Sequence, residues 1–229
     1  MLTSSEKPGA DIFTDFLTIA PHGIAHTHMD AMCHFSYQGQ QYNGFLPTDV
    51  TATGAKHINI EIAHDGIFAR GILVDIPLLK GVPYLEPGTP IYPADLDAWE
   101  KKTGVKIKQG DVVIVRTGRW ARREEKGPWN LAERAGLHAT SVRWLHQRDI
   151  AILGGDASQD VRPSRVEGVE QPVHTLLLVA MGTPIFDNVN TEQIAIECAK
   201  RKRWDFVISA APLTVPNATG SALNPIAIF

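Results

Sequence analysis

The sequence predicts a fold of the α/β class, and three observations support this. The chain has 229 residues, 44% of them hydrophobic and 21% charged, which excludes a disordered, collagen-like or coiled-coil chain. Short apolar runs bounded by turn residues indicate strands. Helical stretches fit between these runs, and such alternation is typical of α/β proteins. We expect residues 1–229 to form a single domain with a core of its own.

Four apolar runs are predicted to be strands of the sheet. Each is short, rich in Val, Ile or Leu, and flanked by turn residues, as expected for buried strands. In chain order, these runs span residues 71–76, 111–115, 151–154 and 206–210.

Four further stretches are predicted to be helices. Proline and acidic residues suit a first helical turn, Thr and Asn can cap one, and glycine often ends one. In chain order, these helices are 93–102 ending before Gly104, 141–147 capped by Thr140, 172–181 ending at Gly182, and 191–200 capped by Asn190.

Charge and cysteine content exclude several functional classes. Lys and Arg number 22 against 25 Asp and Glu, a net charge of −3, which argues against a nucleic-acid partner. The two cysteines exclude a disulfide-rich secreted scaffold. The first residues lack the pattern of a signal peptide, and the longest apolar run is too short to cross a bilayer. We therefore expect a cytoplasmic protein with no membrane partner.

A histidine-rich segment is the strongest functional signal. Four of the nine histidines lie within residues 22–34. In an extended chain alternate side chains share a face, so His26, His28 and Asp30 would converge on one divalent ion. This mixture of nitrogen and oxygen donors suits zinc, manganese or iron better than calcium. The alternative is a polar surface loop, but the density of histidines with an aspartate in phase favours a metal site.

Other parts of the chain must complete such a site. His174 is the leading candidate, because an unpaired imidazole at the start of an apolar helix would be costly, and Asp187 follows thirteen residues later. Taken alone, His174 would be interpreted as a satisfied core histidine. Cys33 is expected to be a small buried side chain and not a ligand. Nearby aromatic residues are predicted either to stack on an aryl substrate or simply to pack under a loop: Phe35, Tyr37, Tyr42 and Phe45.

The segment His26-Thr-His28-Met-Asp30-Ala-Met-Cys-His34 resembles the signature of the metal-dependent cyclase family, usually written H-x-G-T-H-x-D-x-P-x-H. Bacterial kynurenine formamidase, an arylformamidase, and isatin hydrolase belong to this family. Further similarity covers residues 66–77, 110–118, 172–188 and 219–227. The resemblance implies the swivelling β/β/α fold of the family, in which helices surround a compact, barrel-like sheet core.

The resemblance also implies a function. Family members are hydrolases that open an amide or lactam bond of a small, often aryl, substrate. They hold one or two divalent ions, zinc or manganese, and commonly form homo-oligomers such as dimers or tetramers. His28 and His174 match ligand histidines, and Asp30 matches an aspartate that can bridge two ions. Asp187 stands where the family usually has a glutamate ligand, and His34 matches the histidine that serves as general base and acid.

The segment departs from the family signature at three points. Ile24 replaces the first motif histidine, and His26 occupies the position of the motif glycine. Either His26 or the upstream His22 supplies the missing ligand, or one metal site is lost. Met32 replaces the motif proline. The chain also lacks a stretch that precedes the segment in longer members, so we expect a short or N-terminally incomplete form.

Two other functions fit the same residues. One is a metal-assisted cyclase or dehydratase acting on a carbonyl substrate, which would use the same ligands. The other is a non-catalytic metal-binding protein whose site decayed when Ile24 replaced a ligand. Retention of both His34 and His174 argues against the second.

Overall fold

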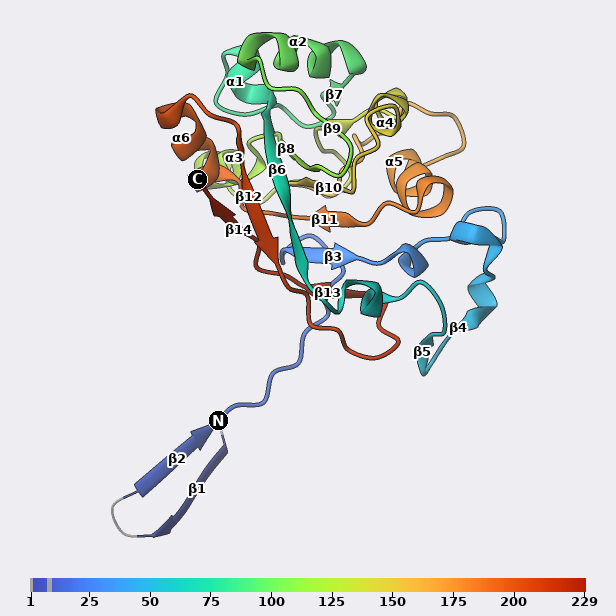
Figure 1. Ribbon diagram of the computed structural model, residues 1–229, viewed down its shortest axis with the longest axis vertical. Coiled ribbons are helices and arrows are strands. Elements are labelled where there is room, and N and C mark those ends of the chain that lie inside the picture. The colour runs from blue at the N-terminus through green and yellow to red at the C-terminus, as the bar shows by residue number, and fades with distance from the viewer. Residues whose placement is uncertain (1, 8–9) are drawn as a thin grey trace.

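The computed structural model describes residues 2–7 and 10–229, with side chains from residue 13 onward. Its main sheet has eight strands in the order β13-β3-β11-β10-β8-β6-β12-β14. The sheet curls strongly, so that β6 runs steeply through the view of Figure 1 while β3 and β11 lie across it. The strands are β3 (His28–Asp30), β6 (Ile67–Asp75), β8 (Val112–Arg116), β10 (Ile152–Gly155), β11 (Ile185–Asp187), β12 (Asp205–Ala210), β13 (Gly220–Ala222) and β14 (Ile226–Ile228).

The centre of this sheet is parallel and its flanks are antiparallel. Strands β6, β8, β10 and β11 run parallel to one another, whereas β3 and β12 pair antiparallel with the ends of this block. Three small two-stranded sheets lie outside it: β1 (Leu2–Lys7) with β2 (Ala10–Thr14), β4 (Val50–Thr51) with β5 (Gly54–Ala55), and β7 (Pro90–Ile91) with β9 (Gly136–Leu137).

Helices cover both faces of the main sheet. They are α1 (Ile76–Lys80), α2 (Pro93–Thr103), α3 (Arg119–Lys126), α4 (Thr140–His146), α5 (Pro172–His174) and α6 (Glu192–Arg201). The helix α5 continues through π-helical turns over Thr175–Met181. In the described part of the chain, no helix has the length and apolar character needed to cross a bilayer.

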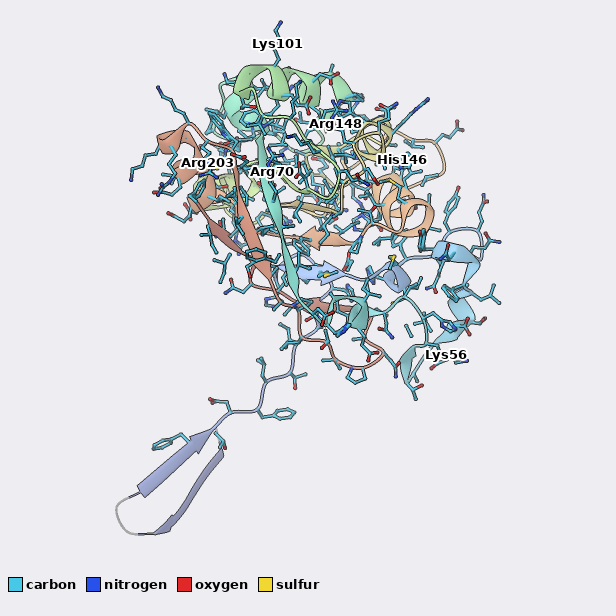
Figure 2. The ribbon with its side chains drawn as sticks, in the orientation of Figure 1. Lys56, Arg70, Lys101, His146, Arg148 and Arg203 are labelled. Carbon is cyan, nitrogen blue, oxygen red and sulfur yellow. The ribbon has the colours of Figure 1, made fainter. Side chains whose placement is uncertain are left out.

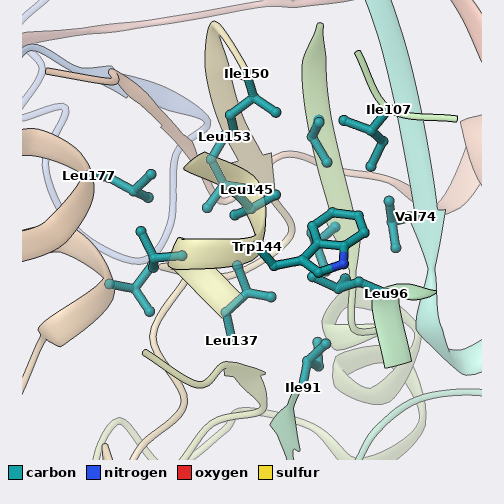
Figure 3. Close-up of a cluster of buried hydrophobic side chains, with 14 of the residues drawn as sticks. Val74, Ile91, Leu96, Ile107, Leu137, Trp144, Leu145, Ile150, Leu153 and Leu177 are labelled. Atoms are coloured by element: carbon teal, nitrogen blue, oxygen red, sulfur yellow. The ribbon is translucent and has the colours of Figure 1, made fainter. Parts of the chain in front are cut away.

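Alternating side chains of the central strands build two hydrophobic cores. Along β8, Val113 and Val115 join one cluster of buried residues, while Val112 and Ile114 join the other. The first core, drawn in Figure 3, lies under α2 and α4 and includes Trp144. The second lies on the α6 side of the sheet. A sheet buried on both faces explains why its central strands read as continuous apolar runs.

Two charged side chains near α2 are placed differently. Figure 2 shows Lys101 extending from α2 into solvent, whereas Arg148 lies against the molecule. Arg148 pairs there with Glu100 of α2 at 3.2 Å. This ion pair helps to hold the segment after α4 against α2.

The predicted α/β class, the four strands and the helices are confirmed, with no bound shifted by more than four residues. As expected, Gly104 and Gly182 end helices in the left-handed conformation. The expectation for Thr140 is wrong, because α4 begins at Thr140 itself and its hydroxyl bonds to the His138 ring instead of capping the helix. Asn190 does accept a hydrogen bond from the backbone of Glu192.

Candidate metal centre

The candidate centre lies where β3, β11 and α5 meet. In the antiparallel pairing of β3 with β11, His28 stands opposite Asp187. Since alternate residues of a strand share a face, His28 and Asp30 point to the same side. The intervening Met29 points into the second core. His174, at the end of α5, completes the cluster from the side.

Four buried side chains form what we call the inner group: His28, Asp30, His174 and Asp187. The Nε2 atom of His28 lies 3.3 Å from Asp30 Oδ1. The Nε2 atom of His174 lies 3.7 Å from Asp30 Oδ2 and 3.5 Å from Asp187 Oδ2. Two imidazole nitrogens and two carboxylates therefore lie next to one another, and donor atoms of His28, Asp30 and Asp187 are close enough together to hold one ion.

Neighbouring groups fix the orientation of the inner group. The Nδ1 atom of His28 donates to the carbonyl oxygen of His26 at 2.8 Å. The Nδ1 atom of His174 bonds to the carboxylate of Asp160 at 2.6 Å, and Gln159 donates to Asp187 at 3.1 Å. Because each Nδ1 is engaged, each Nε2 is left to face the centre, as in protein metal sites.

Two further histidines, His22 and His34, form with Asp30 what we call the outer group. The Nδ1 atom of His22 lies 2.8 Å from Asp30 Oδ1, and its Nε2 lies 2.9 Å from the hydroxyl of Thr219. The rings of His22 and His34 stack with centroids 3.7 Å apart. Donor atoms of His22, Asp30 and His34 lie close enough to hold an ion, as do those of His28, Asp30 and Asp187. Asp30 is therefore common to both groups.

The electrostatics of the centre separate its histidines. Burial would lower the pKa of His174, but the carboxylates of Asp160 and Asp187 raise that pKa to about 10. Burial lowers the pKa of His34 to about 4, despite the nearby charge of Asp30. Burial opposes ionisation of Asp30, but hydrogen bonds from His22 and His28 hold its pKa well below the usual range.

The inner group fits a divalent cation. Burying the Asp30 and Asp187 carboxylates side by side is costly unless a cation compensates their charge. The mixed nitrogen and oxygen donors are those of zinc, manganese or iron sites and not of calcium sites. His28, Asp30, His174 and Asp187 would hold such an ion.

Of the predicted ligands, the structure brings together all but His26. The strand β3 begins only at His28, so the alternation used in the prediction does not extend back to His26. Its imidazole is exposed and belongs to neither group, and only its carbonyl oxygen serves the site. Of the two alternatives for the ligand missing at Ile24, the structure places His22 beside Asp30.

The predicted aromatic residues lie outside the cavity of this site. The ring of Phe35 packs 5.6 Å from that of His174 and against the first core. Tyr37 belongs to an exposed turn with Gln40, and the ring of Tyr42 fills the space beside Gly182. Of these three rings, Phe35 contacts the inner group from outside the cavity, and Tyr37 and Tyr42 do not line it. Cys33 is buried in the second core, as predicted.

A cavity of about 270 Å³ opens onto both groups. Besides the histidines and aspartates, side chains that sequence reasoning missed line this cavity, among them Arg134, Ser158, Arg162 and Gln171. Ser158, Arg162 and the orienting residues Gln159 and Asp160 lie in residues 155–170. The richness of this stretch in Gly, Asp, Ser and Pro is typical of loops that carry sites.

The family model described as "Putative cyclase" matches residues 5–159. The chain belongs to this family. It is 30% identical to a solved structure described as a novel cyclase, with a TM-score of 0.78, covering 89% of this chain and 68% of the other. This agreement confirms the predicted family and its curled sheet with surrounding helices.

More distant solved structures share the fold. Isatin hydrolase A from Labrenzia aggregata, solved bound to benzyl benzoate, is 22% identical with a TM-score of 0.64, over 88% of this chain and 71% of that one. A predicted metal-dependent hydrolase from Bacillus stearothermophilus is 16% identical with a TM-score of 0.60, over 99% and 84%. No curated protein matches the chain closely enough to count as a relative.

Proposed function

We propose that the protein is a metal-dependent hydrolase that opens an amide or lactam bond of a small aryl substrate, as arylformamidases and isatin hydrolases do. The observation that carries the proposal is the inner group. Both of its Nε2 atoms face two buried carboxylates, because both Nδ1 atoms are engaged elsewhere. A divalent ion held there, zinc or manganese, would activate water and polarise the scissile carbonyl.

The outer group supplies a residue to move the proton. Hydrolysis forms a C–O bond from water, breaks the C–N bond and transfers one proton to the leaving nitrogen. Because burial lowers its pKa to about 4, the His34 imidazole is neutral at pH 7 and ready to accept that proton. His22 stacks on His34 and hydrogen-bonds to Asp30, so it holds the base in place beside the inner group.

A second candidate function is a cyclase or dehydratase reaction on a carbonyl substrate. The structure with 30% identity is described as a novel cyclase, and another neighbour is described as a potential metal-dependent hydrolase with cyclase activity. The same inner group would polarise the carbonyl in this reaction. The two functions differ in their products, since only hydrolysis incorporates oxygen from water.

One experiment tests the proposal. The purified protein is stripped with a chelator, reloaded with zinc or manganese, and assayed on N-formylkynurenine and isatin in ¹⁸O-labelled water. We expect at least one bound ion per chain, hydrolysis that depends on it, and label in the carboxylate product. A loaded protein that hydrolyses neither substrate, nor any amide or lactam of a wider panel, would contradict the proposal. Cyclised or dehydrated products without label would favour the second candidate.

A further inference from the structure

Two arginines face the cavity beside the metal centre. Arg134 and Arg162 lie opposite each other in an antiparallel bridge, with backbone hydrogen bonds of 3.1 and 3.0 Å between them. Side chains that stand directly opposite in such a bridge lie on the same face, and like charges there repel each other. Both arginines line the cavity that opens onto the inner group.

The charges of these arginines are poorly compensated within the chain. The Nε atom of Arg134 donates to the carbonyl oxygen of Asp160, and among the described residues no carboxylate lies within ion-pair distance of Arg134. Burial lowers the pKa of Arg134, and the charge of Arg162 lowers it further. Arg162 meets Glu170 at 3.5 Å, but that carboxylate is 89% exposed, so the pair contributes little.

A buried hydroxyl in the same cavity also lacks a partner. Ser158 is only 7% exposed, and its Oγ atom has no hydrogen-bond partner in the described part of the chain. Buried polar groups are nearly always hydrogen-bonded. Ser158 also lines the cavity, so this unpartnered hydroxyl belongs to a residue that a bound molecule would contact.

The charge balance of the cavity favours an anion. Its lining contains two carboxylates, Asp30 and Asp187, and two guanidinium groups, Arg134 and Arg162. With the His174 imidazole neutral, as ligation of an ion requires, these four charges cancel. A divalent cation in the inner group therefore leaves an excess of positive charge on the side where the arginines lie.

We propose that the substrate carries a carboxylate, which Arg134 and Arg162 bind together while the Ser158 hydroxyl donates a hydrogen bond to it. Guanidinium groups match carboxylates in geometry and charge. This inference rests on the proposed function, since it places the carboxylate at the arginines and the scissile amide at the inner group. The substrate is then a small N-acylated amino acid or N-acylated aminobenzoate. Molecules of this class are small enough for the cavity of about 270 Å³.

A matched pair of substrates tests this assignment. N-formylanthranilate and formanilide differ only in the carboxylate. We expect the metal-loaded enzyme to prefer N-formylanthranilate, and Arg134→Gln and Arg162→Gln to raise the KM for that substrate by about 10- to 100-fold, the range for a charge-assisted hydrogen bond. The kcat for both substrates and the KM for formanilide should change little. Ser158→Ala should raise the KM for N-formylanthranilate by about 3- to 10-fold.

Two variants serve as controls. Arg122→Gln removes a guanidinium that pairs with Glu86 and does not line this cavity, so it should leave the preference intact. Arg162→Lys keeps the charge but loses the fork geometry, and it should retain part of the preference. Equal KM values for the two substrates in the parent enzyme, or the same loss in Arg122→Gln as in Arg162→Gln, would overturn the inference.

A binding measurement separates this inference from the proposed function. Calorimetry of benzoate and benzamide with the zinc-loaded protein needs no turnover. Benzoate binding that weakens by about 10-fold or more in Arg134→Gln or Arg162→Gln supports the carboxylate site even if no amide is hydrolysed. Benzoate binding that is equal in the parent and in both variants would show that the anion contacts only the metal, and would overturn the inference while leaving the hydrolase proposal standing.

Discussion

The inner and outer groups share Asp30 but are built in different ways. The inner group stands on β3, β11 and α5, and His28, His174 and Asp187 each have an orienting partner. The outer group stands on a segment before β3 and on a short 3₁₀ turn, and both of its histidines are partly exposed. An ion is therefore best held by the rigid, pre-oriented group, while the partly exposed group is suited to proton transfer.

The largest effect should come from the residue that both groups share. Asp30→Ala removes the carboxylate that lies between His22, His28 and His174. We expect loss of most bound metal, measured by plasma mass spectrometry. The activity should fall by more than about 10⁴-fold, beyond what loss of an acid–base group causes. Asp65→Ala changes a carboxylate that is 90% exposed and should leave both quantities unchanged. Full metal content in Asp30→Ala would refute the shared centre.

The next largest effect tests whether His34 acts as the general base or as a metal ligand. His34→Ala should keep the metal of the inner group and lower kcat by about 10²- to 10⁴-fold. Because a base must be neutral and the pKa of His34 is about 4, the parent activity should fall only as pH drops through that range, well below the 6.5 of a free histidine. Metal loss together with activity would instead make His34 a ligand of a second ion.

A smaller effect should follow from loosening one inner histidine. Asp160→Asn weakens the bond that holds His174 Nδ1, and loss of such an orienting partner typically costs 10- to 100-fold in metal affinity. Competition with a chromophoric chelator measures this affinity. Asp205→Asn, which changes a carboxylate on β12 that pairs with arginines, is the matched control. Unchanged zinc affinity in Asp160→Asn would show that the orienting bond is not needed.

The smallest effect concerns pH in the metal-free protein. The folded pKa of His174 is raised to about 10, above the value of about 6.5 in an unfolded chain. Its contribution to stability is thus fully present below about pH 6.5 and is lost as pH rises through about 10. The difference in Tm between the parent and Asp160→Asn should therefore shrink as pH rises from about 6.5 to about 10. In a chain of this size, each kcal/mol lost from the free energy of unfolding lowers Tm by about 2–4 °C. A Tm difference that grows as pH rises would contradict this prediction.

The sequence predicted the part of the site that depends on local pattern. Two-residue alternation placed His28 and Asp30 on one face, and the helix that begins with Pro172 brought His174 to them. The alternation failed at His26, because the length of β3 is set by its pairing with β11 and β13. Those partners lie more than 150 residues away along the chain, so no local pattern reveals where β3 begins.

The same reason explains what the sequence could not show about the cavity. The aromatic residues were selected by nearness along the chain, yet the lining comes from residues brought together by long-range contacts. The bridge between Arg134 and Arg162 joins two loops, and neither arginine belongs to a recognisable motif. The composition of residues 155–170 is typical of a loop that carries a site, but the roles of Asp160 and Ser158 are visible only in three dimensions.

The hydrogen bond between His22 and Thr219 affects when the site can assemble during synthesis. It joins residues 197 positions apart, and β13, which follows Thr219, pairs with β3. On the ribosome, His28 and Asp30 emerge long before β13, the strand that flanks them. Pairing over such a separation forms late because a long loop must close first. The growing chain therefore cannot assemble a competent centre before β13 has been released.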